Sequence, residues 1–278
     1  MSTANEILQP VPSQGWRRGL GNLLDHELHL WWGTRRWLMQ SLIWILLING
    51  AVAFIGIGIM QTRNPMDPAE ASQITPESIY LILVQVFIQV AVLCTAVGAV
   101  ISAQGTIIQE KQMGTAAWIL SKPVSRPAFI VAKVAPQALG LLVLGMLVPT
   151  IVFYLESSLL TASAPAPVDL LAAMGIWSLV ILFYLTLAIM LGTFLNSRGA
   201  VLGIALGFLF LGAFVPNALP QLAAIFPWKL DGVALLLALG PQAPGPLPPS
   251  AIVPVIATIL WIVIFIALAI WRFGKEEF

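Results

Sequence analysis

The sequence predicts an all-α integral membrane protein, and three observations support this class. Of its 278 residues, 59% are hydrophobic and only 9% are charged, whereas soluble domains are about 45–50% apolar and about 25% charged. Several apolar runs reach the roughly 20 residues that a helix needs to cross a bilayer. The few basic residues gather on alternate connecting segments. A soluble enzyme is excluded, and a net charge of +1 gives no field to attract nucleic acid.

Residues 1–37 are predicted to be a cytoplasmic segment that contains an amphipathic helix. Glu6 lies near the start and the first long apolar run begins only at Leu38, so the segment is too polar for a signal peptide. A helix with tryptophan and arginine around an apolar stripe lies in the headgroup plane. We therefore expect an interfacial elbow helix before the first span. The apolar stripe consists of Trp16, Leu20, Leu23, Leu24, Leu28 and Trp31.

Residues 38–278 are predicted to form one transmembrane domain of six helices. The apolar runs lie at 38–60, 79–103, 128–155, 170–195, 199–228 and 251–271. Pro216 and Pro220 break the outer end of the fifth span, because proline cannot continue a helix. No charged residue lies in any predicted span apart from Lys133. We expect Lys133 to snorkel to the interface, since it is near a helix end.

The placement of the basic residues predicts the orientation. If the N-terminus is inside, eleven of the thirteen lysines and arginines lie on inner segments and only Arg63 and Lys229 lie outside. This is the asymmetry of the positive-inside rule. Both termini are therefore predicted to be cytoplasmic, in the plasma membrane, with a bacterial or archaeal inner membrane as the expected setting.

The last outer loop, 216–250, is rich in proline and contains a short apolar island, 233–239. The island is too short to cross the membrane. We expect it to form a short helix that dips into the outer leaflet or caps the bundle.

The inner loop 104–127, between spans two and three, is predicted to be a helix extension, a break and a short helix across the membrane face. Gly114 can stop the extension, Thr115 can cap the new helix, and Pro123 ends it. Trp118 and Leu120 would then grip either the bilayer or a partner protein.

This loop resembles that of type-two ABC exporter permeases. The shared pattern is an acidic residue, a Gly-Thr pair, then Leu, Pro, Ser-Arg and a later lysine. The six spans, the elbow helix and the long last outer loop resemble the same family over nearly the whole chain. The matching residues are Glu110, Gly114, Thr115, Leu120, Pro123, Ser125, Arg126 and Lys133.

The resemblance implies an exporter permease that pairs with itself or with a sister permease, and with two cytoplasmic ATPases. It implies that the loop is a coupling helix seated in a groove of the ATPase, with apolar anchors ringed by charges. The residues expected to make this contact are Glu110, Lys111, Gly114, Thr115, Trp118, Leu120, Pro123, Ser125 and Arg126.

The chain has no sequence for binding ATP itself. It lacks G-x-x-x-x-G-K-[ST], and its only Gly-Lys pair, Gly274-Lys275, is followed by Glu276. We therefore expect no enzyme activity and no cofactor in this chain, with ATP and Mg²⁺ held by the partner ATPase.

Polar and small residues inside the spans have two interpretations each. Gln85 and Gln89 share a face of span two and would be either interhelical glue or part of a substrate path. Gly199, Gly203 and Gly207 form a double G-x-x-x-G, which predicts a packing seam within the bundle or at a dimer interface. A cleft of apolar residues and two glutamines favours an amphiphilic or lipid-like substrate.

No metal site or hydrolytic centre is predicted. His26 and His29 share a helix face but lack a third ligand, and no histidine lies in a span to activate a serine. Cys94 has no partner for a disulfide. Two other functions remain open at this point: a non-transporting membrane anchor or assembly factor that recruits a cytoplasmic partner, and a membrane-embedded enzyme that acts on lipids.

Overall fold

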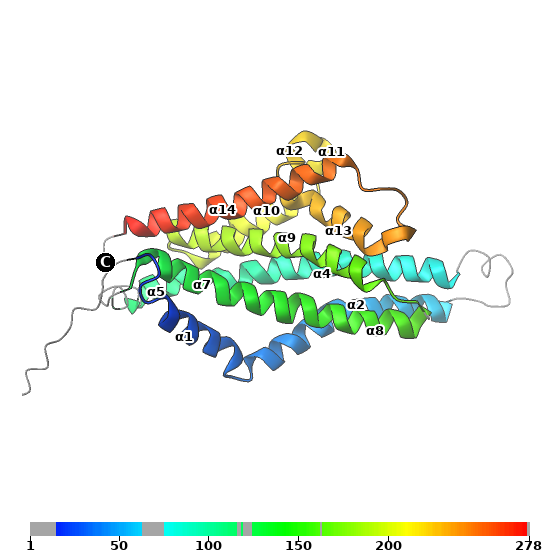
Figure 1. Ribbon diagram of the computed structural model, residues 1–278, viewed down its shortest axis with the longest axis horizontal. Helices are drawn as coiled ribbons and strands as arrows, with labels where there is room; N and C mark the ends of the chain where they lie inside the picture. Colours follow the sequence, from blue (N-terminus) through cyan, green and yellow to red (C-terminus); the bar gives the residue numbers. More distant parts are fainter. Residues whose placement is uncertain (1–14, 63–74, 116–117, 119–123, 162, 277–278) are drawn as a thin grey trace, which may run out of the picture.

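Helices make up nearly all of the computed structural model, which describes residues 15–62, 75–115, 118, 124–161 and 163–276. Among these residues there is no strand. Five helices are long and apolar enough to cross a membrane, and they run alongside one another down the long axis of the molecule (Figure 1). The predicted all-α membrane class is confirmed.

The long helices begin where the sequence carries start signals. α2 (Arg36–Thr62) leads to α4 (Pro76–Ala103), where the Oγ1 atom of Thr75 accepts a hydrogen bond from the N–H of Ser78 at 3.2 Å. Proline stands in the first turn of α4 and of α9 (Pro167–Phe194), where its missing N–H costs nothing. The last long helix is α14 (Ile252–Gly274).

The third predicted span is longer than expected. α7 (Arg126–Gly140), the π-helical segment η1 (Leu141–Leu147) and α8 (Val148–Thr161) form one apolar run of 36 residues. Pro149 lacks a backbone N–H, and the adjacent π turn keeps the helix continuous. The run passes the predicted end at residue 155, so it contains Glu156.

The fifth predicted span does not form one long helix. α10 (Arg198–Leu211) has 14 residues, about 21 Å at 1.5 Å per residue, which is short of the roughly 30 Å of a hydrocarbon core. Gly212 ends it, and the chain folds back so that the indole Nε1 of Trp228 donates to the carbonyl of Phe208 at 3.1 Å. The intervening pieces are α11 (Val215–Ala218), α12 (Pro220–Ala223) and η2 (Pro227–Lys229).

The apolar island of the last loop forms a helix, as predicted. α13 (Leu230–Leu239) packs on α9 and α4, with Leu230 and Ala234 fully buried. The short turns η3 (Gly240–Gln242) and η4 (Pro249–Ala251) lead on to α14. The island thus covers the side of the bundle instead of standing apart from it.

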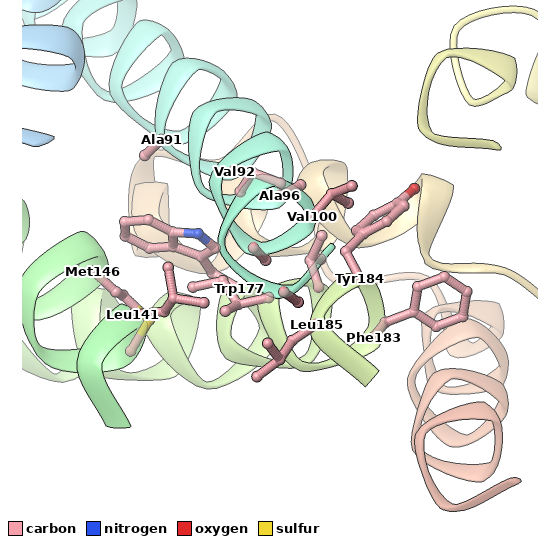
Figure 2. Close-up of a cluster of buried hydrophobic side chains, with 14 of the residues drawn as sticks. Ala91, Val92, Ala96, Val100, Leu141, Met146, Trp177, Phe183, Tyr184 and Leu185 are labelled. Carbon is pink, nitrogen blue, oxygen red and sulfur yellow. The ribbon is translucent and has the colours of Figure 1, made fainter. Parts of the chain in front are cut away.

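α9 is the central helix of the bundle, in contact with α4, α13 and α14. Trp177 of α9 is fully buried, and its Nε1 donates to the Oγ1 of Thr95 in α4 at 2.7 Å. Figure 2 shows Trp177 beside Leu141 and Met146 of the π-helical segment. A buried indole N–H needs such an acceptor, so this bond fixes the position of α9 against α4.

The amphipathic segment predicted in the N-terminal region contains α1 (Leu20–Trp32), which packs against α7 and meets α2 at a sharp bend (Figure 1). Its apolar stripe is half-buried, and Trp31 is 5% exposed. A side chain at Gly140 of α7 would collide with the Trp31 ring. The stripe therefore faces the bundle.

Candidate functional site

A short helix from the inner loop, α5 (Thr106–Gln112), lies at the end of the bundle where α7 begins and α14 ends (Figure 1). We call this end the α5 end. Ile107 and Ile108 are buried and hold α5 against the core. The helix stops before Gly114, whose φ of +70° is the left-handed conformation that glycine adopts at helix ends. This is the stop that the sequence predicts.

Lys133 of α7 joins three helices at the α5 end. Its Nζ atom donates to Oε1 of Glu110 in α5 at 2.5 Å and to Oε1 of Glu27 in α1 at 2.6 Å. Lys133 is only 6% exposed. The expectation that this lysine snorkels to the interface is therefore wrong, because two carboxylates hold it inside the bundle.

A second bond ties α5 to α7 one turn further along. Nε2 of Gln137 donates to Oγ1 of Thr106 at 2.6 Å. Gln137 follows Lys133 by four residues, so both side chains leave the same face of α7. Their spacing in the sequence predicts that Lys133 and Gln137 share a helix face, but it does not reveal that both side chains point toward α5.

The opposite side of α5 is bonded to the end of α9 and to the C-terminal tail. Lys111 Nζ donates to the carbonyl of Thr193 at 3.0 Å and forms an ion pair with Glu276 at 2.5 Å. Nε2 of Gln112 donates to the carbonyl of Asn196 at 3.2 Å. Both α5 side chains thus satisfy backbone groups that the end of α9 leaves open.

α10 is connected to α5 through Gln109. With its amide oxygen turned toward Arg198, Gln109 accepts hydrogen bonds from both terminal guanidinium nitrogens, at 3.0 and 2.8 Å. Arg198 is the first residue of α10. A change in the position of α5 would therefore act directly on the start of α10.

The other end of the loop is also attached to the bundle. The Ser125 hydroxyl donates to the carbonyl of Trp16 and accepts from the N–H of Ala128 at 3.2 Å, which caps α7. Arg126 donates to the carbonyl of Gly274 at the end of α14. The loop 104–127 is therefore bonded to the bundle at both its ends.

The residues proposed from sequence for an ATPase contact divide into two groups. Glu110 and Lys111 are paired with other charged residues of the bundle, and Arg126 is bonded to the end of α14. Trp118 is 60% exposed and Met113, which the sequence analysis omitted, is 72% exposed. Thr115 is half-buried. Leu120 and Pro123 lie outside the described residues.

We refer to the polar residues that bond α5 to its surroundings as the α5 cluster. The sequence analysis missed most of them, because their partners are far apart in the chain. A local pattern cannot reveal contacts such as that between residues 27 and 133. The cluster consists of Glu27, Thr106, Gln109, Glu110, Lys111, Gln112, Lys133, Gln137, Arg198 and Glu276.

A cavity of about 780 Å³ lies directly beside the α5 cluster, between α1, α2, α4 and α7. One wall is polar and carries two buried acceptors that no described residue satisfies, Oε1 of Gln137 and Oε2 of Glu110. The other wall is apolar and is lined by Leu47, Leu93, Val97 and Ile101. The cavity therefore suits a molecule with one polar and one apolar part.

The two glutamines of span two face away from the bundle. Gln85 and Gln89 are both exposed on α4, and no hydrogen bond joins either to another described residue. Their i, i+4 row continues through Leu93 to the cavity. Within the described chain, the two glutamines do not bond one helix to another. Two roles are left for them: lining a substrate path, or contacting a second permease.

The glycine seam of α10 is also open. Gly199, Gly203 and Gly207 are exposed, and a side chain at Gly203 or Gly207 would meet no atom of the described chain within 4 Å. The interpretation as a packing seam inside one bundle is therefore wrong. The seam faces the outside of the bundle.

Five apolar helices of membrane-spanning length define a multi-pass membrane protein. It has a polar cluster at one end of the bundle and an amphipathic cavity beside that cluster. The family model for ABC-2 family transporter proteins matches residues 33–278. The chain therefore belongs to the ABC-2 transporter family, whose members are permease subunits that work with a separate ATPase subunit. No curated protein matches the chain.

Proposed function

We propose that this chain is the permease subunit of an ABC exporter, in which two permeases form the substrate path and two cytoplasmic ATPases dock at the α5 end. The observation that carries the proposal is the bonding of α5 to α7, α9, α10 and the C-terminal tail, together with the bond from Lys133 of α7 to α1. Because α5 is bonded to several helices, a displacement of α5 is transmitted to the whole bundle.

The same proposal sets the orientation and the number of crossings. Basic residues gather at the α5 end, which is therefore cytoplasmic, together with both termini. α9 ends and α10 begins at this end, and α14 returns to it. The chain between α10 and α14 must then cross once, so α10 with the short helices after it is the fifth of six crossings. α1 serves as the elbow helix at the cytoplasmic face.

Docking relies on the exposed apolar part of the loop. Met113 and Trp118 flank Gly114 and together offer an anchor for a groove in the ATPase. Interface energy concentrates in such aromatic residues. Inside the permease, the ion pairs and hydrogen bonds of the α5 cluster transmit the displacement of the loop to the helices. ATP and Mg²⁺ are bound by the ATPase.

The substrate path follows the open faces of α4 and α10. A second permease packed along the glycine seam would enclose Gln85 and Gln89 in a cleft that continues into the cavity beside α5. An amphiphilic or lipid-like substrate matches the cavity, because its apolar and polar walls lie side by side.

The direct test is reconstitution of the permease with an ATPase encoded next to it. We expect the complex in proteoliposomes to hydrolyse ATP faster than the ATPase alone and to move a fluorescent amphiphile across the bilayer. A stable complex without nucleotide-driven movement of any amphiphile tried would favour the membrane-anchor function instead.

A substitution in the glycine seam tests the dimer. Gly203→Leu is expected to leave the permease folded, because the added side chain has room within the chain, and to weaken permease dimerisation by preventing close helix approach. Chemical cross-linking in nanodiscs measures the dimer fraction. Gly175→Leu, at an exposed glycine of α9 with equal room, is the matched control. Unchanged dimer content in Gly203→Leu would contradict the seam.

A further inference from the structure

Glu156 places a half-buried carboxyl group in α8, five residues before that helix ends at Thr161. Its Oε2 accepts a hydrogen bond from Nδ2 of Asn49 at 3.3 Å, and Asn49 is the central residue of α2 (Arg36–Thr62). A carboxylate within an apolar run of membrane-spanning length is costly, and such residues are retained for ligands, ions or buried partners.

The neighbours of Glu156 leave two acceptors without a donor. Asn49 is 4% exposed, and its Nδ2 also donates to the carbonyl of Pro149 at 3.1 Å. The Oδ1 atom of Asn49 is buried and has no partner among the described residues. Since Asn49 provides the single hydrogen bond that reaches Glu156 from the described chain, an amide oxygen and a carboxylate lie together with unused lone pairs.

Glu156 lines an apolar groove between α2 and α8 with a volume of about 410 Å³, while the Oδ1 atom of Asn49 is buried. Gly50 and Ala53 leave space on the α2 side, and the α8 wall is built of aliphatic side chains. The remaining lining residues are Val152, Leu155, Leu159 and Leu160.

We infer that this groove binds the ammonium group of a cationic amphiphile, with its alkyl chain along the aliphatic wall. The Glu156 carboxylate has lone pairs that no described residue uses, and an ammonium group matches both its charge and its need for a donor. A lipid acyl chain brings no donor. A second copy of this chain is a poor occupant, because the described parts of its membrane-spanning helices carry no lysine or arginine at the ends opposite the α5 end.

The site is separate from the cavity beside α5 and from ATPase docking. Amine binding needs neither nucleotide nor a partner subunit, so its failure would leave the proposed transport function untouched. Conversely, a permease without an ATPase partner would still be expected to bind the amine.

The test is saturable cross-linking of a photoactivatable dodecylamine to the full-length permease in phosphatidylcholine nanodiscs, mapped by mass spectrometry. We expect labelling of α2 and α8, and an affinity about ten-fold weaker in Glu156→Gln, since a neutral amide replaces a charge-assisted bond. The Gln side chain can accept the same bond from Asn49, which preserves the fold. Glu77→Gln, a carboxylate at the start of α4, is the control and should bind as the unmodified chain does.

Three further measurements complete the test. Val152→Phe should fill the groove and abolish labelling without altering Glu156. A photoactivatable dodecanol should label weakly and equally in the unmodified chain and in Glu156→Gln. Butylamine should fail to compete. Equal amine binding by Glu156→Gln, equal labelling by the alcohol and the amine, or full competition by butylamine would each overturn the inference.

Discussion

Lys133→Met is expected to lower the free energy of unfolding by about 3–5 kcal/mol, because it leaves Glu27 and Glu110 buried without their cation. It should also reduce permease-stimulated ATP hydrolysis to the level of the ATPase alone, since Lys133 joins α5 to α1 and α7. Denaturation monitored in detergent measures the first effect, and reconstituted ATPase assays measure the second.

Two comparison variants make this prediction specific. Lys275→Met removes another cation at the α5 end, one that lies over the Trp271 ring, and should change little. The triple variant Glu27→Gln, Glu110→Gln and Lys133→Met leaves no unpaired charge and should regain most of the stability. If Lys133→Met were as stable as the unmodified chain, the buried ion triad would have no role in holding these helices together.

Trp118→Ala is expected to abolish stable ATPase binding while leaving the permease fold unchanged. Trp118 is 60% exposed, so most of its surface is accessible to a partner protein. Truncating an aromatic anchor costs about 2 kcal/mol or more of binding free energy, which is about thirty-fold in Kd. Pull-down of the ATPase by permease in nanodiscs measures the effect.

Trp271→Ala is the matched control for docking. Trp271 lies near the same end of the bundle and is 52% exposed, but it belongs to α14. It should bind the ATPase with the affinity of the unmodified chain. Equal affinity in Trp118→Ala, or an equal loss in Trp271→Ala, would contradict an anchor specific to the loop.

The long helices could be predicted from sequence because their signal is local. Runs of apolar residues define α2, α4, α9 and α14, and the caps at Thr75 and Ser125 mark helix starts. The end of the third span could not be predicted, since Glu156 appears in sequence as the start of a polar loop. Only its bond to Asn49 reveals that it belongs to the same helical run and contacts α2.

The candidate site could be predicted only in outline. The motif around Glu110 and Gly114 indicates the right loop, but the partners of its side chains come from α7, α9, α10 and the C-terminal tail. The sequence therefore predicts Glu110 and Lys111 as surface charges for a partner. In the structure their charges are neutralised within the permease, because a buried loop helix must pair its ionised groups.

The proposed function requires that the ATPase binds the loop at Trp118, and cross-linking from that position tests this contact most directly. A photoreactive phenylalanine analogue in place of Trp118 is introduced into the complex in nanodiscs, with the same analogue at Ile259, an exposed apolar residue of α14, as control. We expect cross-links from position 118 to the ATPase subunit and from position 259 to lipid or permease alone. Cross-links from position 118 to lipid alone, in a complex that still hydrolyses ATP, would contradict it.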